Sequence, residues 1–456
     1  MGRRQTQKLI AETSPRPALI ATFMSPLLDV LPSELLLLII SLLSIADTQT
    51  LRQTCRTLCQ LTHDKSLWLA RLDHIRQLGD TPLPPPLCDP IFVAAEFSSR
   101  AIESAVISAT RSTDSWLHPR EMVPLIPAVH GQVIAGLEIF LDKWLLVVYL
   151  SGRAQLWDMA NRDSVATLDL GHGAWSYFGC LTSGKIMLAM SSVETETFLY
   201  TVDSTGFTLL GSFRCAEDRT VRAIDAERHL VVCHSATPEL SVICWDDQAK
   251  WTIPLDDTEE MYNNVLAVHL LGSHILAIRA RTVELHPWPQ VPSLVMVHRL
   301  PSALGPASIC VSDPIPSSAD NSYTIFILSN GINHLSLYKV LVSGGTMDVS
   351  LAGAMRPDNS KHLFISAHAL GLRAGRAMWV ERQRSTIARR VNLCTLSQRR
   401  EAWHEMAANG AVVFTLASYD LRDDLTHCAL AEVSGRIAFG NRAGAVFLLE
   451  NKRLQG

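Results

Sequence analysis

The chain is 456 residues long, 48% of them hydrophobic and 18% charged, and its formal net charge is −4. This composition is typical of a globular protein with a large core and argues against extensive disorder. Because the net charge is small, no bulk electrostatic field favours nucleic acid or an anionic membrane, and we expect neither as a partner.

The ten cysteines are scattered along the chain and form no Cys-x-x-Cys pair. This pattern indicates reduced thiols, and we expect a cytoplasmic or nuclear protein, or one found in both compartments. Residues 1–25 are expected to form a disordered N-terminal tail. Their four basic residues against a single acid faintly resemble an organelle transit peptide, but a loose terminus is the preferred interpretation.

Residues 31–72 predict three short helices. In the first, Leu35, Ile39 and Leu42 recur at helical spacing, and further leucine and isoleucine residues fill the other sides. A helix that is apolar nearly all round must be buried on more than one face. A segment of about forty residues cannot cover so much apolar surface alone, so we expect a partner chain to cover part of it. The alternative is a helical subdomain that packs only against its own protein.

Two more helices are expected in the same stretch. Asp47 is a candidate cap for the second helix, and Asp64 is a candidate cap for the third. The second helix carries one stripe made of Leu51, Cys55, Leu58 and Thr62, and the third carries Leu67, Trp68 and Leu72.

Residues 26–75 resemble the F-box. The resemblance rests on the opening Leu31-Pro32-x-Glu34-Leu35 and on the closing Asp64-x-x-Leu67-Trp68 at F-box distance. In that family the segment docks on a Skp-family adaptor, which joins it to a cullin ubiquitin ligase. The resemblance therefore implies an adaptor-binding surface formed or supported by Leu31, Pro32, Leu35, Ile39, Leu51, Cys55, Leu58 and Trp68.

Residues 76–120 read as a linker. The stretch from Thr81 to Pro90 contains five prolines, which favour an extended, semi-rigid spacer. Apolar residues at every fourth position then predict a bridging helix over residues 91–110 that fixes the orientation of the segments on either side.

Residues 121–456 change to a strand pattern. Runs 144–150 and 153–159 form one expected hairpin, and runs 324–329 and 332–340 form another. An aromatic residue near the end of the second strand recurs at intervals of about 40–50 residues, with one double interval that places a missing unit near residues 386–393. Seven such units predict an all-β, seven-bladed propeller. The anchors are Trp157, Tyr200, Trp245, Trp288, Tyr338 and Phe447.

Two of these units resemble WD repeats, because Trp157-Asp158 and Trp245-Asp246 match the Trp-Asp pair of that family. The other units lack the pair, so the resemblance is to a divergent WD-repeat-like propeller. The seventh unit ends at its third strand, residues 444–450. We expect residues 122–129 to supply the fourth strand and close the ring, and an irregular lead-in is the alternative.

Catalytic motifs were not found in the sequence. It holds no Gly-x-Ser-x-Gly, no Gly-x-x-x-x-Gly-Lys, no His-Glu-x-x-His and no paired cysteine ligand set. We therefore expect no catalytic residues, no metal and no cofactor.

The turns inside the propeller hairpins carry charge. Those of units one, four, six and seven hold arginine, whereas those of units two and three hold glutamate. In a closed ring most of the basic turns form an arc, and guanidinium groups suit phosphate or carboxylate. We predict that the arc binds an acidic or phosphorylated peptide, the alternative being turns that are charged only for solubility. The predicted substrate-binding residues are Arg153, Arg279, Arg281, Arg382, Arg384 and Arg442.

The F-box resemblance implies a non-catalytic substrate-recognition subunit of a Skp–cullin–F-box ubiquitin ligase. Its F-box would bind the adaptor, and its propeller would bind a protein substrate. Two alternatives stay open: an F-box scaffold that acts outside the ligase, and a propeller enzyme with a helical appendage.

Overall fold

The computed structural model describes residues 31–451 apart from several internal stretches. Those stretches are 79–80, 85–86, 89–95, 130, 183, 193–195, 215–219, 236, 257–262, 290–295, 306–308, 318–321, 332–333, 356–362, 384–386 and 397–409. The chain divides into two compact units, one made of Met1–Ile75 and Val93–Ile107, the other of Arg76–Phe92 and Ser108–Gly456. Among the described residues, none of the helices has the length and apolar character needed to cross a membrane.

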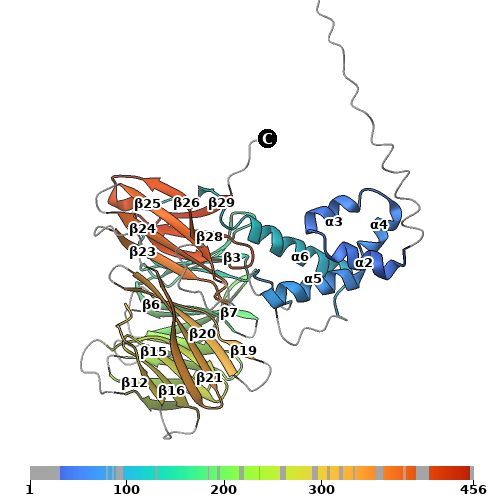
Figure 1. Ribbon diagram of the computed structural model, residues 1–456. Coiled ribbons are helices and arrows are strands. Elements are labelled where there is room, and N and C mark those ends of the chain that lie inside the picture. The colour runs from blue at the N-terminus through green and yellow to red at the C-terminus, as the bar shows by residue number, and fades with distance from the viewer. Residues whose placement is uncertain are drawn as a thin grey trace, which may run out of the picture. The chain divides into compact units, whose positions relative to one another are not determined.

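Helices come first along the chain and carry the lowest residue numbers (Figure 1). They are α2 (Ser33–Ser41), α3 (Ile45–Leu51), α4 (Arg56–Leu61), α5 (Lys65–Leu78) and α6 (Ser99–Asp114). Ile40, Leu58 and Leu67 form the small core that α2, α4 and α5 share. The fold class predicted for this part of the chain, a small all-α segment, is confirmed.

The second predicted helix differs from the structure in two ways. It is divided into α3 and α4, with Cys55 in extended backbone at the start of α4. Its cap is Ser44, not Asp47, because Ser44 is the residue in extended conformation and its hydroxyl accepts the Asp47 N–H at 3.0 Å. The prediction for Asp64 is confirmed, since its carboxylate accepts the Ser66 N–H at 2.7 Å in the first turn of α5.

The bridging helix predicted over residues 91–110 is observed as α6, from Ser99 to Asp114. Residues 91–95 of the prediction lie outside the described part of the chain. In the first unit, Glu103 of α6 accepts from Arg52 at 2.6 Å and lies 3.3 Å from His63 Nδ1. These contacts attach the first half of α6 to the turns around α4.

Seven antiparallel sheets follow, and in blades one to four and in blade six the strands pair in chain order. Blade one contains β2 (Ile134–Phe140), β3 (Trp144–Tyr149), β4 (Arg153–Asp158) and β5 (Asp163–Asp169). Blade two contains β6 (Ala174–Thr182), β7 (Lys185–Ser192), β8 (Glu196–Asp203) and β9 (Gly206–Arg214). Blade three contains β10 (Thr220–Asp225), β11 (Leu230–His234), β12 (Glu239–Cys244) and β13 (Lys250–Pro254). Blade four contains β14 (Val265–Leu271), β15 (His274–Arg279), β16 (Thr282–Pro287) and β17 (Met296–Arg299).

The remaining three blades vary this plan slightly. Blade five has a divided first strand and contains β18 (Ile309–Val311), β19 (Ile315–Ser317), β20 (Ser322–Gly331), β21 (His334–Ser343) and β22 (Thr346–Met355). Blade six contains β23 (Leu363–Leu370), β24 (Arg376–Gln383), β25 (Ala388–Thr395) and β26 (Gly410–Ala417). Blade seven contains β27 (Leu425–Leu430), β28 (Ile437–Asn441), β29 (Val446–Asn451) and, from before blade one, β1 (Arg120–Ile126).

The ring closes as predicted. β1 pairs antiparallel with β29, with Met122 opposite Leu449 and Val123 opposite Leu448. First strands of adjacent blades lie next to each other, as β6 and β10 or β23 and β27 do, and β2 contacts β27 across the closure. Figure 1 shows the red strands of blade seven beside β3 of blade one. The all-β, seven-bladed propeller predicted from the sequence is therefore confirmed.

The residues just before β1 fix the closure. Trp116 is fully buried in the core shared by blades six and seven, and its indole N–H donates to Cys394 O at 3.1 Å. The guanidinium groups of Arg376 and Arg120 lie 4.7 and 5.3 Å from its ring. Arg376 also donates to Ser112 and Thr113 of the chain leading to Trp116. Aromatic, cation and hydrogen-bond contacts thus hold this segment between two blades.

The two Trp-Asp pairs do not form a shared hydrogen-bond network. The Trp157 indole nitrogen is buried and has no hydrogen-bond partner in the described part of the chain. The Asp158 carboxylate caps its own turn by accepting the N–H groups of Ala160 and Asn161. Asp246 instead contacts His229, whose ring stacks on Trp245 at 5.1 Å. In this propeller the pair therefore stabilises turns within single blades.

Candidate functional site

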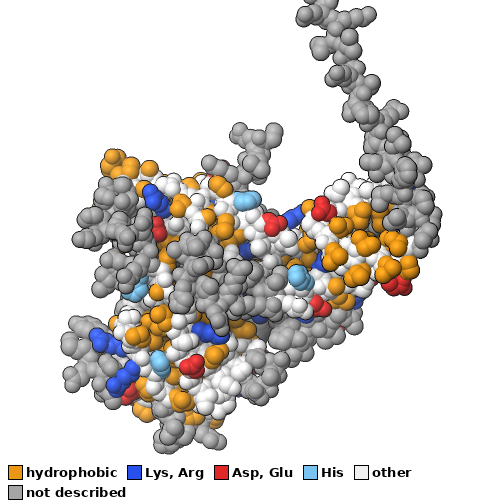
Figure 2. All heavy atoms as spheres, viewed as in Figure 1, with side chains coloured by type: hydrophobic (Ala, Val, Ile, Leu, Met, Phe, Trp, Pro, Cys, Tyr) orange, Lys and Arg blue, Asp and Glu red, His pale blue; other side chains and the backbone are white. Residues whose placement is uncertain are grey.

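α2 has one covered face and one uncovered face. Leu36 and Ile40 point inward and are 7% and 1% exposed. The opposite side is apolar too and open to solvent: Leu35 is 47% exposed, Leu38 60%, Ile39 49% and Leu42 81%. Figure 2 shows hydrophobic side chains gathered over this helical region. We call Leu35, Leu38, Ile39 and Leu42 the α2 apolar face.

A contiguous group of exposed leucine and isoleucine side chains is unusual on a protein surface and marks an interaction site. Isolated exposed apolar residues are ordinary, but these four follow each other along one helix at spacings of three and four. The arrangement therefore supplies a ridge that another protein can cover.

Arg71 of α5 forms hydrogen bonds that hold the C-terminal end of α2. One nitrogen of its guanidinium donates to Ile40 O and Leu43 O, each at 3.0 Å, and to Thr48 Oγ1 at 2.6 Å. These bonds satisfy Leu43 O and add to the bond that Ile40 O accepts from the Leu43 N–H at 3.1 Å, at the C-terminal end of α2. Burial lowers the pKa of Arg71, and the guanidinium lies 5.1 Å from the Trp68 ring. Trp68 is itself fully buried and donates to Thr62 O at 2.9 Å.

The predicted adaptor-binding residues fall into three groups. Pro32, Leu35 and Ile39 are exposed, and Leu58 and Trp68 are buried supports. The three that are half-buried are Leu31, Leu51 and Cys55.

The sequence reasoning left Leu38 and Leu42 out of the adaptor-binding set, although they are the two most exposed members of the α2 apolar face. The sequence does contain a pattern that would have included them, because Leu35, Leu38 and Leu42 are spaced by three and four residues and so lie on one side of a helix. What the pattern could not show is which side of an all-apolar helix its own core covers.

The second candidate site is the predicted substrate-binding surface of the propeller. The turn between the second and third strand of each blade lies at the same end of the sheet in every blade, because the strands alternate in direction. Arg442 lies in this turn of blade seven, Arg382 near the end of β24 in blade six, and Arg153 at the start of β4 in blade one. These three blades are consecutive in the ring. Arg279 and Arg281 come from the turn of blade four. Arg384 lies outside the described residues.

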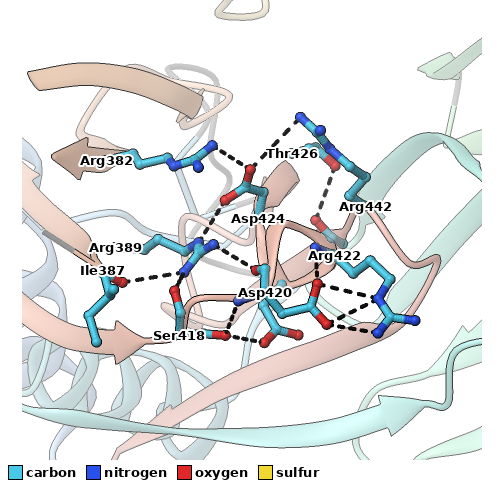
Figure 3. A network of polar contacts seen from close by, with 11 residues as sticks. Arg382, Ile387, Arg389, Ser418, Asp420, Arg422, Asp424, Thr426 and Arg442 are labelled. Carbon is cyan, nitrogen blue, oxygen red and sulfur yellow. Dashed lines mark hydrogen bonds and ion pairs between the residues drawn. The ribbon is translucent and has the colours of Figure 1, made fainter. Parts of the chain in front are cut away.

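Asp424 joins the arginines of blades six and seven (Figure 3). Its side chain is only 3% exposed; one oxygen accepts from Arg382 at 2.5 Å and the other from Arg389 at 2.7 Å. Arg442 is the third cation, at 3.8 Å. Arg389 is buried to 3% exposure, whereas Arg382 and Arg442 are 26% and 58% exposed. One buried carboxylate thus holds two solvent-facing guanidinium groups, and the cluster keeps an excess of positive charge.

The loop before β27 presents Asp424 to these arginines. It contains a short 3-10 turn, η3 (Leu421–Asp423), that Asp420 caps by accepting the Arg422 N–H at 2.9 Å. Arg389 donates to Ser418 O and Asp420 O at 2.7 and 2.9 Å, which ties the loop to β25. Contacts within the chain therefore hold the loop in place.

Arg279 of blade four is placed differently. Its side chain is 6% exposed and donates to Glu284 Oε1 at 2.6 Å, to Asn263 O at 2.8 Å and to Asp256 O at 2.5 Å. Glu284 is fully buried, and its pKa stays below the usual value: burial, which would raise it, is outweighed by hydrogen bonds from His286 and Arg279. Arg279 thus contributes an internal ion pair that holds the turn.

The other two predicted arginines are closer to solvent. Arg281 is exposed and follows Arg279 in the same turn, where its N–H donates to Asn263 Oδ1 at 2.8 Å. Arg153 is half-buried, and its Nε has no hydrogen-bond partner in the part of the chain that the structure describes. The structure therefore brings together Arg382 and Arg442, leaves Arg153 on the adjacent blade, and separates Arg281 from them by blade five.

Within the described ranges, no group of three or more histidine, cysteine, aspartate or glutamate side chains is arranged to hold a metal ion.

Comparison with known proteins gives one family match and two similar solved structures. Residues 28–71 match the family model of the F-box-like domain. No curated protein sequence matches the chain. Among solved structures, the chain is similar to Raptor from Chaetomium thermophilum, with a TM-score of 0.52, 10% identity, and coverage of 87% of this chain and 37% of that one. It is also similar to the β-propeller domain of Cps50 (Swd1) from Myceliophteria thermophila, with a TM-score of 0.50, 8% identity, and coverage of 71% of this chain and 98% of that one. At this identity the likeness concerns the fold alone.

Proposed function

We propose that this chain, which joins an F-box-like domain at residues 28–71 to a seven-bladed β-propeller, is a substrate-recognition subunit of a Skp–cullin–F-box ubiquitin ligase. The observation that carries the proposal is the α2 apolar face, because it lies inside the F-box-like segment and is open to solvent. In this proposal the face binds a Skp-family adaptor, and the adaptor joins the chain to a cullin.

The energetics fit a stable interface. Burying a large apolar side chain is worth roughly 1.5–3 kcal/mol, and the α2 apolar face offers four. Part of this gain is offset by the entropy lost on association. A few well-packed central residues commonly dominate such interfaces, and Leu38 and Leu42 are the most exposed candidates for that role.

The propeller is the proposed receptor for the target protein. Arg382, Arg442, Arg153 and Arg281 suit an acidic or phosphorylated segment, because guanidinium groups bind carboxylate and phosphate with paired hydrogen bonds. The chain performs no chemistry itself. Holding a target near a conjugating enzyme raises the local concentration of the reacting groups and needs no reactive side chain here.

Calorimetry with a purified Skp-family adaptor tests the first step. Leu38→Asp combined with Leu42→Asp places two charges where the partner must remove water, so we expect adaptor affinity to fall at least about 100-fold. Both residues are exposed, so the variant retains its fold, and circular dichroism verifies this.

The matched control is Leu209→Asp, since Leu209 is 54% exposed on β9 of the propeller. This variant should bind the adaptor like the wild type. Unchanged adaptor affinity in the folded α2 variant would reject the proposed docking surface.

A scaffold that binds the adaptor but works outside the ligase makes the same first prediction. The two functions separate at the cullin, which co-purifies with the adaptor only if the chain enters a ligase.

A further inference from the structure

A pocket opens between blades seven and one, on the face of the propeller opposite to Arg442. Its volume is ≈ 260 Å³. The walls are the β27–β28 turn, the β4–β5 turn and the end of β29. The β27–β28 and β28–β29 turns lie at opposite ends of β28, so this pocket is separate from the Asp424 cluster.

The lining is predominantly basic. It contains Arg120, Arg162 and Arg436, against a single acid, Glu450. Arg162 donates to both Glu450 oxygens, at 2.7 and 2.8 Å, so these two charges compensate each other. Arg436 donates to the backbone oxygen of Asp142 at the long distance of 3.3 Å, and its charge also helps to lower the pKa of Asp158, which is not part of the lining. Two positive charges of the lining therefore remain without a lining carboxylate.

Of Arg120 and Arg436, Arg120 gives the stronger indication that an anion binds here. It is 5% exposed, and its terminal nitrogens donate to neutral carbonyls, Gly435 O at 2.8 Å and Trp116 O at 3.2 Å. Its Nε has no hydrogen-bond partner, and no ion pair to Arg120 is found, within the described parts of the chain. Burial, and then the neighbouring Arg376, lower its pKa to about 10. A buried cation without a counter-charge is costly, so an anion nearby would stabilise it.

Carboxylates close to the pocket are already engaged. Asp142 accepts the Ser434 N–H and hydroxyl at 2.8 and 2.9 Å. Asp158 caps the turn that leads to Arg162, and Glu432 accepts backbone N–H groups at the start of β24. These three acids fix turns around the pocket and none of them ion-pairs with Arg120 in the described structure.

We propose that this pocket binds a tetrahedral oxyanion of the phosphate class, with Arg162 and Arg436 as direct donors and Arg120 as a buried positive charge behind them. The guanidinium fork matches the geometry of phosphate oxygens. A dianion also matches the charges of Arg120 and Arg436, which have no carboxylate partner within the lining. Arg162 is 42% exposed, so its guanidinium can reach a bound anion from the pocket mouth.

Thermal unfolding of the full-length chain in inorganic phosphate tests the site, with chloride adjusted to keep the ionic strength constant. Phosphate raises the stability of many proteins without binding, so only the difference between variants is informative. We expect a saturable rise in the unfolding midpoint of the wild type. Arg436→Gln should weaken the apparent phosphate affinity at least about tenfold.

Two further variants keep the test decisive. Ala160→Glu puts a carboxylate at an exposed position of the lining and should abolish the response even if Arg436→Gln does not fold. Arg422→Gln removes an arginine that is 77% exposed near Asp424 and should respond like the wild type. Equal responses in all four proteins, or no response beyond that to chloride, would overturn the proposal.

A phosphoserine titration then identifies the source of the anion. Tighter binding of phosphoserine than of inorganic phosphate supports a modified side chain as the ligand. Equal or weaker binding supports a free anion in the same site.

Discussion

At the residue scale, one half-buried pair of side chains makes stability depend on pH. Glu138 on β2 and Tyr177 on β6 pack against each other between blades one and two. Each side chain fills the space beside a glycine of the other strand. A Cβ added to Gly136 would overlap the Tyr177 hydroxyl, and one added to Gly179 would overlap the Glu138 carboxyl group. Burial raises the pKa of Glu138 to about 8, against the opposing effect of the Tyr177 hydrogen bond. The carboxyl group is therefore protonated at neutral pH in the folded protein.

The sign of the effect follows from linkage. The folded state holds the Glu138 proton more tightly than the unfolded state does, so this group's contribution is fully present below its unfolded pKa and declines as pH rises toward about 8. Each unit of pKa difference corresponds to about 1.4 kcal/mol.

Glu138→Gln should remove this dependence, because the amide keeps the shape and a hydrogen-bonding group but does not ionise. We expect the variant to exceed the wild type in free energy of unfolding by at least about 1 kcal/mol at pH 8, and to differ little at pH 5. Denaturant unfolding at both values measures this. A difference between the two proteins that is the same at pH 5 and pH 8 would contradict it.

At the element scale, the helices show where sequence reasoning succeeds and where it stops. Apolar spacing was sufficient to predict a helix at α2 and to propose that part of it meets a partner. It was not sufficient to separate Leu36, which is buried, from Leu38, which is exposed, because both belong to one run of leucines. That separation depends on contacts with α4 and α5, which are distant in the sequence.

The propeller turns show the same limit. Their arginines could be identified because hairpin signals are local. The acceptor that arranges them could not, since Asp424 lies 42 residues from Arg382 and 35 from Arg389. Likewise, nothing local marks Arg279 as a buried partner of Glu284.

Arg382→Gln combined with Arg442→Gln tests the proposed target-binding turns. We expect weaker capture of a phosphoserine-containing acidic peptide, by about tenfold or more at low salt, with the wild-type advantage shrinking as salt increases. Arg389 still neutralises Asp424 in this variant, so the fold is preserved.

The matched control for the turns is Arg422→Gln, which removes an equally charged exposed residue beside Asp420. It should retain most of the binding. Equal losses in the two variants would mean that the peptide responds to net charge and not to the arranged pair.

At the scale of the whole molecule, the repeat was the most informative feature of the sequence. Four of the aromatic anchors lie on the third strand of their blade: Trp157 on β4, Tyr200 on β8, Tyr338 on β21 and Phe447 on β29. The unit that lacked an anchor is blade six, whose third strand is β25. Counting strands also predicted that β1 closes blade seven, since a ring leaves no edge unpaired. The anchoring of Trp116 between blades six and seven was not predicted, because it depends on Arg376 and Cys394 far along the chain.

The proposed function assigns two separate interfaces to the chain: the α2 apolar face would bind the ligase, and the propeller turns would bind the target. Affinity purification from cells with quantitative mass spectrometry, comparing the wild type with Leu38→Asp plus Leu42→Asp, tests it most directly. We expect the variant to lose a Skp-family adaptor and a cullin together and to keep proteins bound through the propeller. Adaptor and cullin recovered in equal amounts with both proteins, or found with neither, would contradict it.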